Sequence, residues 1–282
     1  MSFDEIRPHS GPIRIDVGAV LESRLGAKSA RVPHWVVRRL ESLIRQDRLN
    51  EMLRVAYPRR GAEFCRAVID HLGITVQVNG ISNMPAKDQR RVIFVSNHPL
   101  GGLDGMALID FVASHYSCSP RFVVNDLLMA VEPLRKVFLP INKHGAQSRE
   151  SITAIDEAME ADVPVIIFPA GLCSRRRRGK VADLEWRKMF VQKAREFHRD
   201  IVPIGFCAEN SPAFYRAARW RERLGIKLNI EMALLPGEIF KAEGKTFTLN
   251  VGKLIEWNTL MPDARAETAR IRRAVDQLLK QV

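Results

Sequence analysis

The sequence is poor in cysteine and contains no long apolar stretch. Its four cysteines, Cys65, Cys118, Cys173 and Cys207, have neither the spacing of metal ligands nor the pattern of a disulfide framework. We therefore expect reduced thiols, a cytosolic protein and no bound metal. No apolar run reaches the roughly 18 residues that span a bilayer, and residues 1–18 mix acids, an arginine and prolines, unlike a signal peptide. Any association with a membrane is therefore expected to be peripheral.

Internal repeats and low-complexity segments are also absent, apart from the arginine run 175–178. The chain has 282 residues, of which 46% are hydrophobic and 27% charged, as in a globular protein that folds without disulfides or metals. Acidic residues number 32 against 44 lysines and arginines, which gives a net charge of +12. Such a surplus favours an anionic partner, such as a membrane surface, a phosphorylated substrate or nucleic acid. Because no helix-turn-helix, zinc-finger or aromatic RNA-binding motif is present, nucleic acid is the less favoured partner.

Short β-branched runs alternate with helical patterns along most of the chain. Strands are predicted over residues 91–96, 121–124, 163–168 and 201–206, and the alternation continues less clearly through 227–235 and 247–251. Helices are predicted over residues 104–115, 127–137, 148–160, 184–198 and 262–280. This alternation predicts an α/β fold with a mostly parallel sheet flanked by helices on both faces. The functional site of such a sheet lies beyond the carboxyl ends of its strands.

The N-terminal part has a different pattern. Residues 1–76 are predicted to be a leader and a helical extension, ahead of an α/β domain at 77–282. Helical patterns cover residues 33–56 and 61–72. In the first of these, Trp35, Leu40 and Leu43 lie beside many arginines, a composition typical of an interfacial helix on anionic lipid. The alternative, that these apolar residues pack on the α/β core, stays open.

A histidine follows the strand at 91–96, inside a glycine-rich loop. His98 has the side chain whose pKa lies nearest neutrality, and Asp104 comes six positions later, where a helix begins. A carboxylate on the imidazole Nδ1 would fix its tautomer and stabilise the imidazolium, so that a substrate hydroxyl serves as the nucleophile. Gly101 and Gly102 permit tight curvature and close approach of a ligand. The alternative is a loop histidine, a turn and a helix-capping aspartate.

Three further clusters contain or follow a predicted strand. In the segment 168–180, the backbone around Gly171, together with Ser174 and Arg175, could hold a phosphate or a polar head group. Most of the arginine run is expected to be a solvated surface, with Arg175 alone at the site. The segment 138–143 ends in Asn142 and Lys143, and the segment 201–205 contains Val-Pro-Ile.

In their order and spacing, these four clusters resemble the glycerophospholipid (lysophospholipid) acyltransferase family, the PlsC-like acyltransferases, over residues 77–256. The resemblance implies transfer of a fatty acyl group from a thioester of acyl carrier protein or coenzyme A to the hydroxyl of a lysolipid, with no covalent acyl-enzyme and no cofactor. It assigns His98 as the general base and Asp104 as its orienting partner. The substrate-binding positions that it implies are Asn97, Gly101, Gly102, Lys143, Gly171, Ser174 and Arg175.

The chain departs from the family pattern at three places. Five residues rather than four separate the histidine from the aspartate, Ala170 and Leu172 replace a glutamate and a threonine, and Asn142-Lys143 stands where an arginine is common. The last two changes concern acceptor binding. Lysophosphatidic acid is the default acceptor, and an N-acylated amino acid, as in ornithine- or glycine-lipid synthesis, is the alternative. The leader and the N-terminal helices resemble the aminolipid and haemolysin-like branch.

The resemblance also implies a location, because acceptor and product both reside in a bilayer. We expect the protein to be cytoplasmic and peripheral on the inner face of the cell membrane. Two non-enzymatic alternatives stay open. One is a nucleic-acid-binding protein, supported by the net charge and the arginine run, and the other is a lipid-binding protein of the same fold without catalysis, supported by the longer spacing between the histidine and the aspartate.

Overall fold

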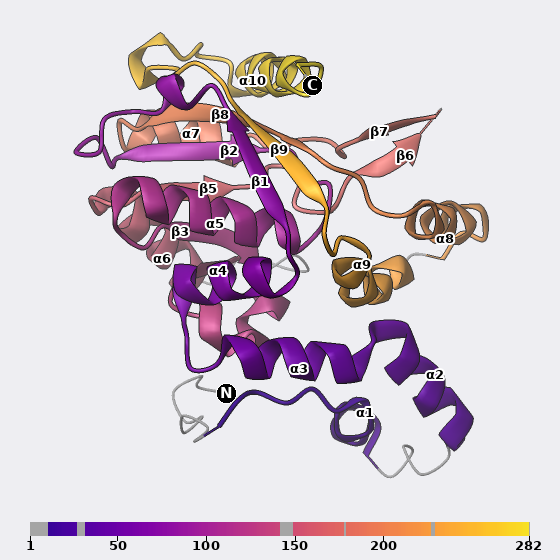
Figure 1. Cartoon of the computed structure of the whole chain (residues 1–282). Helices are drawn as coiled ribbons and strands as arrows, with labels where there is room; N and C mark the ends of the chain where they lie inside the picture. The colour runs from indigo at the N-terminus through magenta and orange to yellow at the C-terminus, as the bar shows by residue number, and fades with distance from the viewer. Residues whose placement is uncertain (1–10, 27–31, 142–148, 178, 227–228, 282) are drawn as a thin grey trace.

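The computed structural model describes residues 11–26, 32–141, 149–177, 179–226 and 229–281 (Figure 1). Its centre is a seven-stranded sheet in the order β1-β9-β8-β2-β5-β3-β4. The strands are β1 (Thr75–Asn79), β2 (Val92–Ser96), β3 (Arg121–Asn125), β4 (Phe138–Ile141), β5 (Val165–Ile167), β8 (Asp200–Cys207) and β9 (Thr246–Val251). Neighbouring strands run parallel except β8 and β9, which are antiparallel. The predicted α/β fold with a mostly parallel sheet is confirmed.

The central strand β2 is buried on both faces, as its unbroken apolar sequence predicts. Because side chains alternate along a strand, Val92 and Phe94 enter one core while Ile93 and Val95 enter the other. The first core is covered by α3 (Gln46–Ala56), α4 (Gly61–His71) and α5 (Leu103–Tyr116). The second is covered by α6 (Arg149–Glu160), α7 (Met189–Glu196) and α10 (Ala264–Leu278). Helices therefore cover both faces, as expected.

The N-terminal helices are only partly separate from this core. The single helical pattern at 33–56 forms two helices, α2 (His34–Ile44) and α3, because Arg45 takes a left-handed conformation with φ of 55°. Helix α3 buries Leu49, Met52, Leu53 and Ala56 in the core that contains Phe94. Helix α2 buries no residue, and α1 (Val17–Leu25) precedes it. The predicted boundary at residue 76 falls inside β1, so α3 and α4 are structurally part of the α/β domain.

Two predicted helices differ from the structure. Residues 127–137 contain two short 3₁₀ segments, η4 (Asp126–Ala130) and η5 (Glu132–Leu134), in place of one helix. Pro133 lies in the middle of this stretch, and a proline removes a helical hydrogen bond and clashes with the preceding turn. The helix predicted at 184–198 begins only at Met189, because the backbone N–H of Arg187 donates to Pro169 and the Trp186 indole donates to Asp183.

Several elements were not predicted from the sequence. These are β1, α8 (Pro212–Arg223), α9 (Leu235–Lys241) and the antiparallel hairpin of β6 (Arg175–Arg177) with β7 (Lys180–Ala182). Within 227–235, where the alternation was expected to continue, the structure has the 3₁₀ segment η6 (Ile230–Leu234). The hairpin contains most of the arginine run, which the sequence analysis places in a surface loop. None of the helices in the described ranges is both long enough and apolar enough to cross a bilayer.

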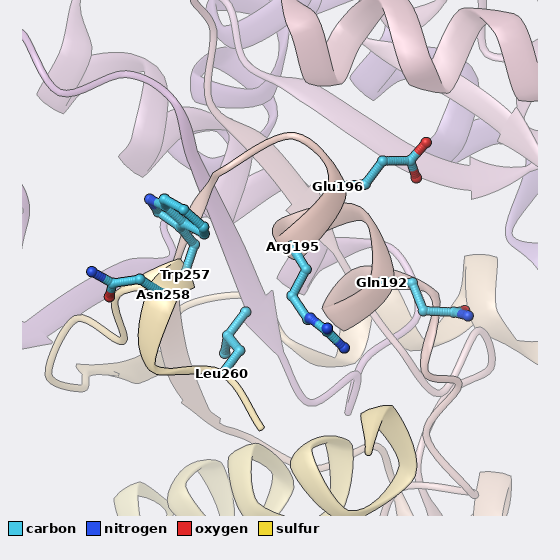
Figure 2. A pocket seen from close by; sticks show the side chains of 6 residues that line it. All are labelled: Gln192, Arg195, Glu196, Trp257, Asn258 and Leu260. Carbon is cyan, nitrogen blue, oxygen red and sulfur yellow. The ribbon is translucent and has the colours of Figure 1, made fainter. Parts of the chain in front are cut away.

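A surface hollow marks one end of the sheet (Figure 2). It lies between α7 and η7 (Trp257–Thr259) and is lined by Gln192, Arg195, Glu196, Trp257, Asn258 and Leu260. The backbone N–H of Trp257 donates to Asp200, the first residue of β8, which places the hollow at the amino end of that strand. The histidine loop follows the last residue of the parallel strand β2. The hollow is therefore at the opposite end from the predicted site.

Candidate active site

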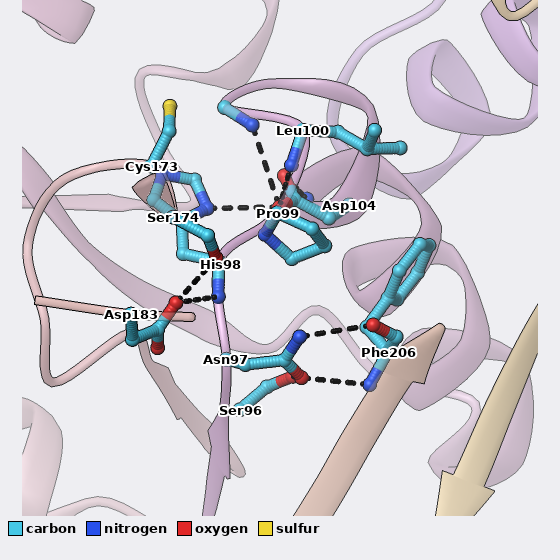
Figure 3. A network of polar contacts seen from close by, with 12 residues as sticks. Ser96, Asn97, His98, Pro99, Leu100, Asp104, Cys173, Ser174, Asp183 and Phe206 are labelled. Atoms are coloured by element: carbon cyan, nitrogen blue, oxygen red, sulfur yellow. Dashed lines mark hydrogen bonds and ion pairs between the residues drawn. The ribbon is translucent and has the colours of Figure 1, made fainter. Parts of the chain in front are cut away.

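His98 and Asp104 meet beyond the carboxyl end of β2 (Figure 3). The strand ends at Ser96 and α5 begins at Leu103, so the intervening loop places the histidine opposite the first turn of the helix. Nδ1 of His98 lies 2.9 Å from Oδ2 of Asp104. The aspartate side chain is fully buried, whereas that of the histidine is 14% exposed. This leaves Nε2 as the imidazole nitrogen that a substrate can use.

His98 and the backbone around Asp104 together hold its carboxylate in the ionised form. Oδ2 accepts the N–H of Leu100 at 2.8 Å, and Oδ1 accepts the N–H of Gly105 at 2.9 Å. Burial alone would raise the pKa of Asp104, but the attraction of His98 and these hydrogen bonds outweigh it, and the pKa lies below its usual value. An ionised carboxylate keeps the proton on Nδ1 of His98 and leaves Nε2 free to accept one.

The additional residue between the histidine and the aspartate is accommodated at Gly101. This glycine has φ of 85°, and a Cβ there would lie 2.6 Å from Sγ of Cys173 and 2.7 Å from Cδ1 of Leu235. Only glycine combines this backbone angle with so close an approach. Gly102 is the N-cap of α5, and a Cβ there would meet nothing within 4 Å. Five intervening residues are therefore compatible with contact between the two catalytic candidates.

The imidazole ring is also oriented by an aromatic side chain. The rings of His98 and Phe168 are stacked, with centroids 4.2 Å apart and an interplanar angle of 23°. Phe168 directly follows β5, the neighbour of β2 in the sheet, and its ring meets Phe122 edge to face. The sequence analysis placed Phe168 in a cluster but gave it no role. Asp104 thus fixes one edge of the imidazole and Phe168 covers one face.

A second aspartate joins the histidine loop to the loop after β5 (Figure 3). Oδ1 of Asp183 accepts the backbone N–H of His98 at 3.1 Å and the hydroxyl of Ser174 at 2.6 Å. Oδ2 accepts the indole N–H of Trp186 at 2.9 Å, and the backbone N–H of Ser174 donates to the carbonyl of His98 at 2.7 Å. Asp183 could not be predicted from the sequence, where its one local signal is the tryptophan three positions later.

We expect the Asp183→Ala variant to lose about 10²-fold in kcat, the effect of displacing a catalytic group by a fraction of its contact distance. The KM for the acceptor should stay the same, because Asp183 positions the backbone of His98 and is not assigned to substrate. Steady-state kinetics of the variant check this split, with Asp88→Ala as a control at an exposed position. A raised KM with unchanged kcat would instead make Asp183 a substrate-binding residue.

Two predicted substrate-binding side chains are engaged with the protein itself. The amide of Asn97 donates to the carbonyl of Phe206 at 2.9 Å and accepts its N–H at 2.8 Å. This residue therefore ties the end of β2 to β8. Ser174 is buried and its hydroxyl is used by Asp183. Both side chains are hydrogen-bonded within the protein, and their assignment to substrate binding stays a prediction.

Arg175 is also placed differently from the prediction. Its guanidinium is buried, with Nη2 at 2.6 Å from Oε1 of Glu231 and Nη1 at 2.7 Å from the carbonyl of Cys173. Arg221 approaches the other oxygen of Glu231 at 2.8 Å. A buried arginine engaged in this way is not an open head-group site, because binding a lipid anion would require breaking the ion pair. The prediction that Arg175 contacts the acceptor is therefore not supported by its geometry.

The remaining predicted positions have fewer constraints. Gly171 is exposed, with φ of 63°, and a Cβ there would meet nothing within 4 Å. Lys143 and the neighbouring Asn142 lie outside the described residues. Within the described ranges, no group of three or more histidine, cysteine or acidic side chains could hold a metal ion. The chemistry that the geometry supports is proton transfer at Nε2 of His98.

Comparison with known proteins bears directly on this chemistry. A family model described as acyltransferase matches residues 19–280. The chain belongs to this acyltransferase family. The resemblance seen in the four sequence clusters is thus confirmed, and the match also includes most of the N-terminal helices. The chain is an acyltransferase whose candidate base and orienting carboxylate lie where the sequence predicts them.

Two relatives of this acyltransferase are similar to it over most of their length. A lyso-glycine lipid O-acyltransferase from Phocaeicola vulgatus is 43% identical over 245 residues, which is 87% of each chain. A protein of the same name from Bacteroides thetaiotaomicron is 40% identical, covering 87% of this chain and 89% of that protein. Among solved structures, the 1-acyl-sn-glycerophosphate (LPA) acyltransferase PlsC from Thermotoga maritima is 17% identical, with a TM-score of 0.46 over 82% of this chain and 86% of that one.

Proposed function

We propose that this acyltransferase transfers a fatty acyl group from a thioester to the hydroxyl of a lyso-glycine lipid. The observation that carries the reaction is the 2.9 Å contact between His98 and the buried Asp104. The names of the two relatives at 43% and 40% identity support the acceptor. Lysophosphatidic acid, the default acceptor suggested by the sequence motifs, becomes the alternative acceptor. Lyso-glycine lipid is the acceptor that we expect the enzyme to prefer.

The proposed reaction is a single displacement assisted by a general base. Nε2 of His98 takes the proton of the acceptor hydroxyl while the oxygen attacks the thioester carbonyl. The C–O bond of the ester forms, the C–S bond breaks, and the proton leaves with the thiolate as the free thiol of the carrier. Asp104 stabilises the imidazolium during the transfer. General-base assistance of this kind contributes about 10²–10⁴-fold to the rate, and the proposed mechanism uses no metal or other cofactor.

The charge around Arg175 supports an acceptor with a carboxylate head group over one with a phosphate head group. In the described part of the chain, the guanidinium of Arg175 is paired with Glu231, so the site has one cationic group fewer for a doubly charged head group. A phosphate monoester needs several donors in a fork arrangement, whereas a glycine carboxylate carries one charge. The loop around Gly171 stays the candidate for this contact, although the N–H of Gly171 itself donates to the carbonyl of Phe168 at 3.0 Å.

The donor and the location follow from the same proposal. The donor is a fatty acyl thioester of acyl carrier protein or of coenzyme A. Because acceptor and product are both lipids, the enzyme works as a peripheral protein on the inner face of the cell membrane. The exposed Trp35 and the absence of buried residues in α2 support contact with a lipid surface.

An acceptor panel tests the proposed function. Purified protein is given labelled palmitoyl thioesters of acyl carrier protein and of coenzyme A with lyso-glycine lipid, lyso-ornithine lipid, lysophosphatidic acid or other lysophospholipids. We expect the highest kcat/KM with lyso-glycine lipid and the product to be an ester. Preference for lysophosphatidic acid would overturn the acceptor, and transfer to none of the acceptors, from either carrier with membranes present, would overturn the enzymatic proposal.

A further inference from the structure

The most exposed large apolar side chains gather on two helices. Among the described residues, Trp35 of α2, Leu224 at the end of α8 and Trp220 of α8 rank highest, with 70%, 65% and 62% of their surface exposed. Exposing large apolar groups to water is unfavourable, and an exposed apolar surface is typical of one that binds a partner. Trp220 and Leu224 lie four positions apart on α8, and Trp35 lies on α2. Such a partner has to cover two separate helices.

Helix α8 has an outer face that combines basic and large apolar side chains. Phe214, Tyr215 and Ala218 are buried on its inner face. The opposite face presents Arg216, Trp220, Arg223 and Leu224, which are spaced by four, three and one residues and are all exposed. We refer to these four residues as the α8 outer face. Tryptophan, leucine and arginine together are the composition of a helix that lies at a lipid interface.

The arginines of the α8 outer face are not balanced by acids. Arg221, on the side of the helix, pairs with Glu231 and Glu222. Arg216 and Arg223 form no ion pair with any residue that the structure describes. Two unpaired guanidinium groups beside exposed apolar side chains fit anionic head groups, since long basic side chains lie along an apolar surface and keep their charge in the head-group layer.

Helices α8 and α2 both lie near the candidate active site. Asn210, just before α8, donates to the carbonyl of Pro99 in the histidine loop at 2.9 Å. Both α2 and α8 contact η6, and α2 also contacts α9. The approach of α2 to α9 is so close that a Cβ on Gly237 would lie 2.7 Å from the carbonyl oxygen of Leu43. Figure 1 shows α2, α9 and α8 along one side of the molecule.

Helix α9, which contacts α2, also contacts the loop that contains His98. Leu235, the first residue of α9, lies within 2.7 Å of where a Cβ on Gly101 would be. A lipid surface that covers α2 and α8 therefore lies next to the loop that contains His98. An acceptor anchored in that surface has a short path to the base.

We propose that α2 and the α8 outer face form one docking surface for an anionic membrane, with Trp35, Trp220 and Leu224 in the interface and Arg216 and Arg223 on lipid phosphates. This inference rests on the proposed function, because a lipid acceptor explains why the surface adjoins the site. The spread of apolar groups over two helices favours a bilayer over an acidic carrier protein. An acidic protein on the same arginines is the competing outcome of the test below.

The first experiment measures binding of the full-length protein to vesicles. Vesicles of phosphatidylcholine with phosphatidylglycerol are compared with phosphatidylcholine alone. For Arg216→Gln with Arg223→Gln, we expect partition onto the anionic vesicles to weaken about 30-fold, equivalent to about 2 kcal/mol for two charges near such a surface. The control is Arg265→Gln with Arg273→Gln on the exposed side of α10, which changes the net charge equally on another side of the protein. Equal weakening by both pairs would overturn the proposal.

A second readout separates insertion from charge. Brominated lipid in the anionic vesicles quenches tryptophan fluorescence where the indole enters the acyl boundary. We expect Trp220→Phe and Trp35→Phe each to remove part of the quenching, and Trp257→Phe, at the other end of the sheet, to leave the quenched amount unchanged. Quenching that is the same in Trp220→Phe and in the wild type would place α8 outside the membrane.

Activity measurements distinguish this inference from the proposed function. With lyso-glycine lipid in anionic vesicles, the Arg216→Gln/Arg223→Gln variant should lose activity in proportion to its lost binding. If the variant binds vesicles normally but fails only with the carrier-protein thioester, the arginines dock the carrier protein and the membrane assignment is wrong. If the wild type binds vesicles through α8 but acylates no acceptor, the docking surface stands and the proposed reaction fails.

Discussion

We expect the His98→Ala variant to lose about 10²–10⁴-fold in kcat, the contribution of a positioned general base. The loss follows from the geometry of the site, because Nε2 of this imidazole is the basic atom that the dyad makes available. The KM for the thioester should change little, since truncation at Cβ removes a group that acts on the acceptor hydroxyl. The check is steady-state transfer from a labelled thioester to lyso-glycine lipid.

His115→Ala is the matched control for this experiment. His115 lies in the last turn of α5, the helix whose first turn contains Asp104, and its Nε2 contacts the carbonyl of Pro85. Like His98, it is a partly buried histidine, and it lies on the helix that contains Asp104. A general effect of losing an imidazole would therefore appear in both variants. Retention of wild-type kcat by the His98→Ala variant, with a cooperative unfolding transition, would remove this residue from the mechanism.

The part of the site that could be predicted from the sequence is formed by residues that lie close together along the chain. His98 and Asp104 are six positions apart, and a buried strand before them with a helix after them is enough to bring both to the carboxyl end of β2. Of the two glycines between them, Gly101 has the predicted conformational role, with φ of 85° and a close approach to Cys173, whereas a Cβ on Gly102 would meet nothing within 4 Å. The α/β fold was likewise predictable, because short apolar strands and amphipathic helices have distinct periods.

What could not be predicted depends on contacts between distant segments. Asp183 binds the backbone N–H of His98 across 85 positions, and Glu231 pairs with Arg175 across 56. No local pattern indicates which carboxylate meets which donor, because tertiary packing decides it. The pairing of Arg175 with Glu231 could not be predicted for this reason, since a motif gives the type of side chain and not the partner that it meets.

The Asp104→Asn variant should lose about 10²–10⁴-fold in kcat while it keeps the fold. Asparagine has nearly the same shape, so the loop can close, but one carboxylate oxygen becomes an amide NH₂ group. If this group faces His98, it donates to Nδ1 and forces the imidazole proton onto Nε2, where the base must be free. It then also opposes the backbone N–H of Leu100, which donates to Oδ2 in the wild type. If it turns the other way, it opposes the backbone N–H of Gly105, which donates to Oδ1 in the wild type.

Stability against pH provides an independent check on the same variant. The pKa of Asp104 in the folded protein lies below its ordinary value of 3.8. A depressed pKa means that the ionised carboxylate stabilises the fold above the unfolded-state pKa, and that this contribution is lost as the pH falls through the folded-state pKa. The wild type should therefore exceed Asp104→Asn in free energy of unfolding at neutral pH, and the gap should shrink below about pH 4.

The two measurements on Asp104→Asn together separate orientation from folding. Denaturant unfolding from pH 7 down to pH 3 gives the stability gap, and acyl transfer at pH 7 gives the loss in kcat. A large loss of activity in a variant that remains folded at pH 7 is the signature of a wrong histidine tautomer, because the base is present but protonated at the wrong nitrogen. Full activity in that folded variant would mean that His98 acts without Asp104, and the buried carboxylate would then serve only the loop that it caps.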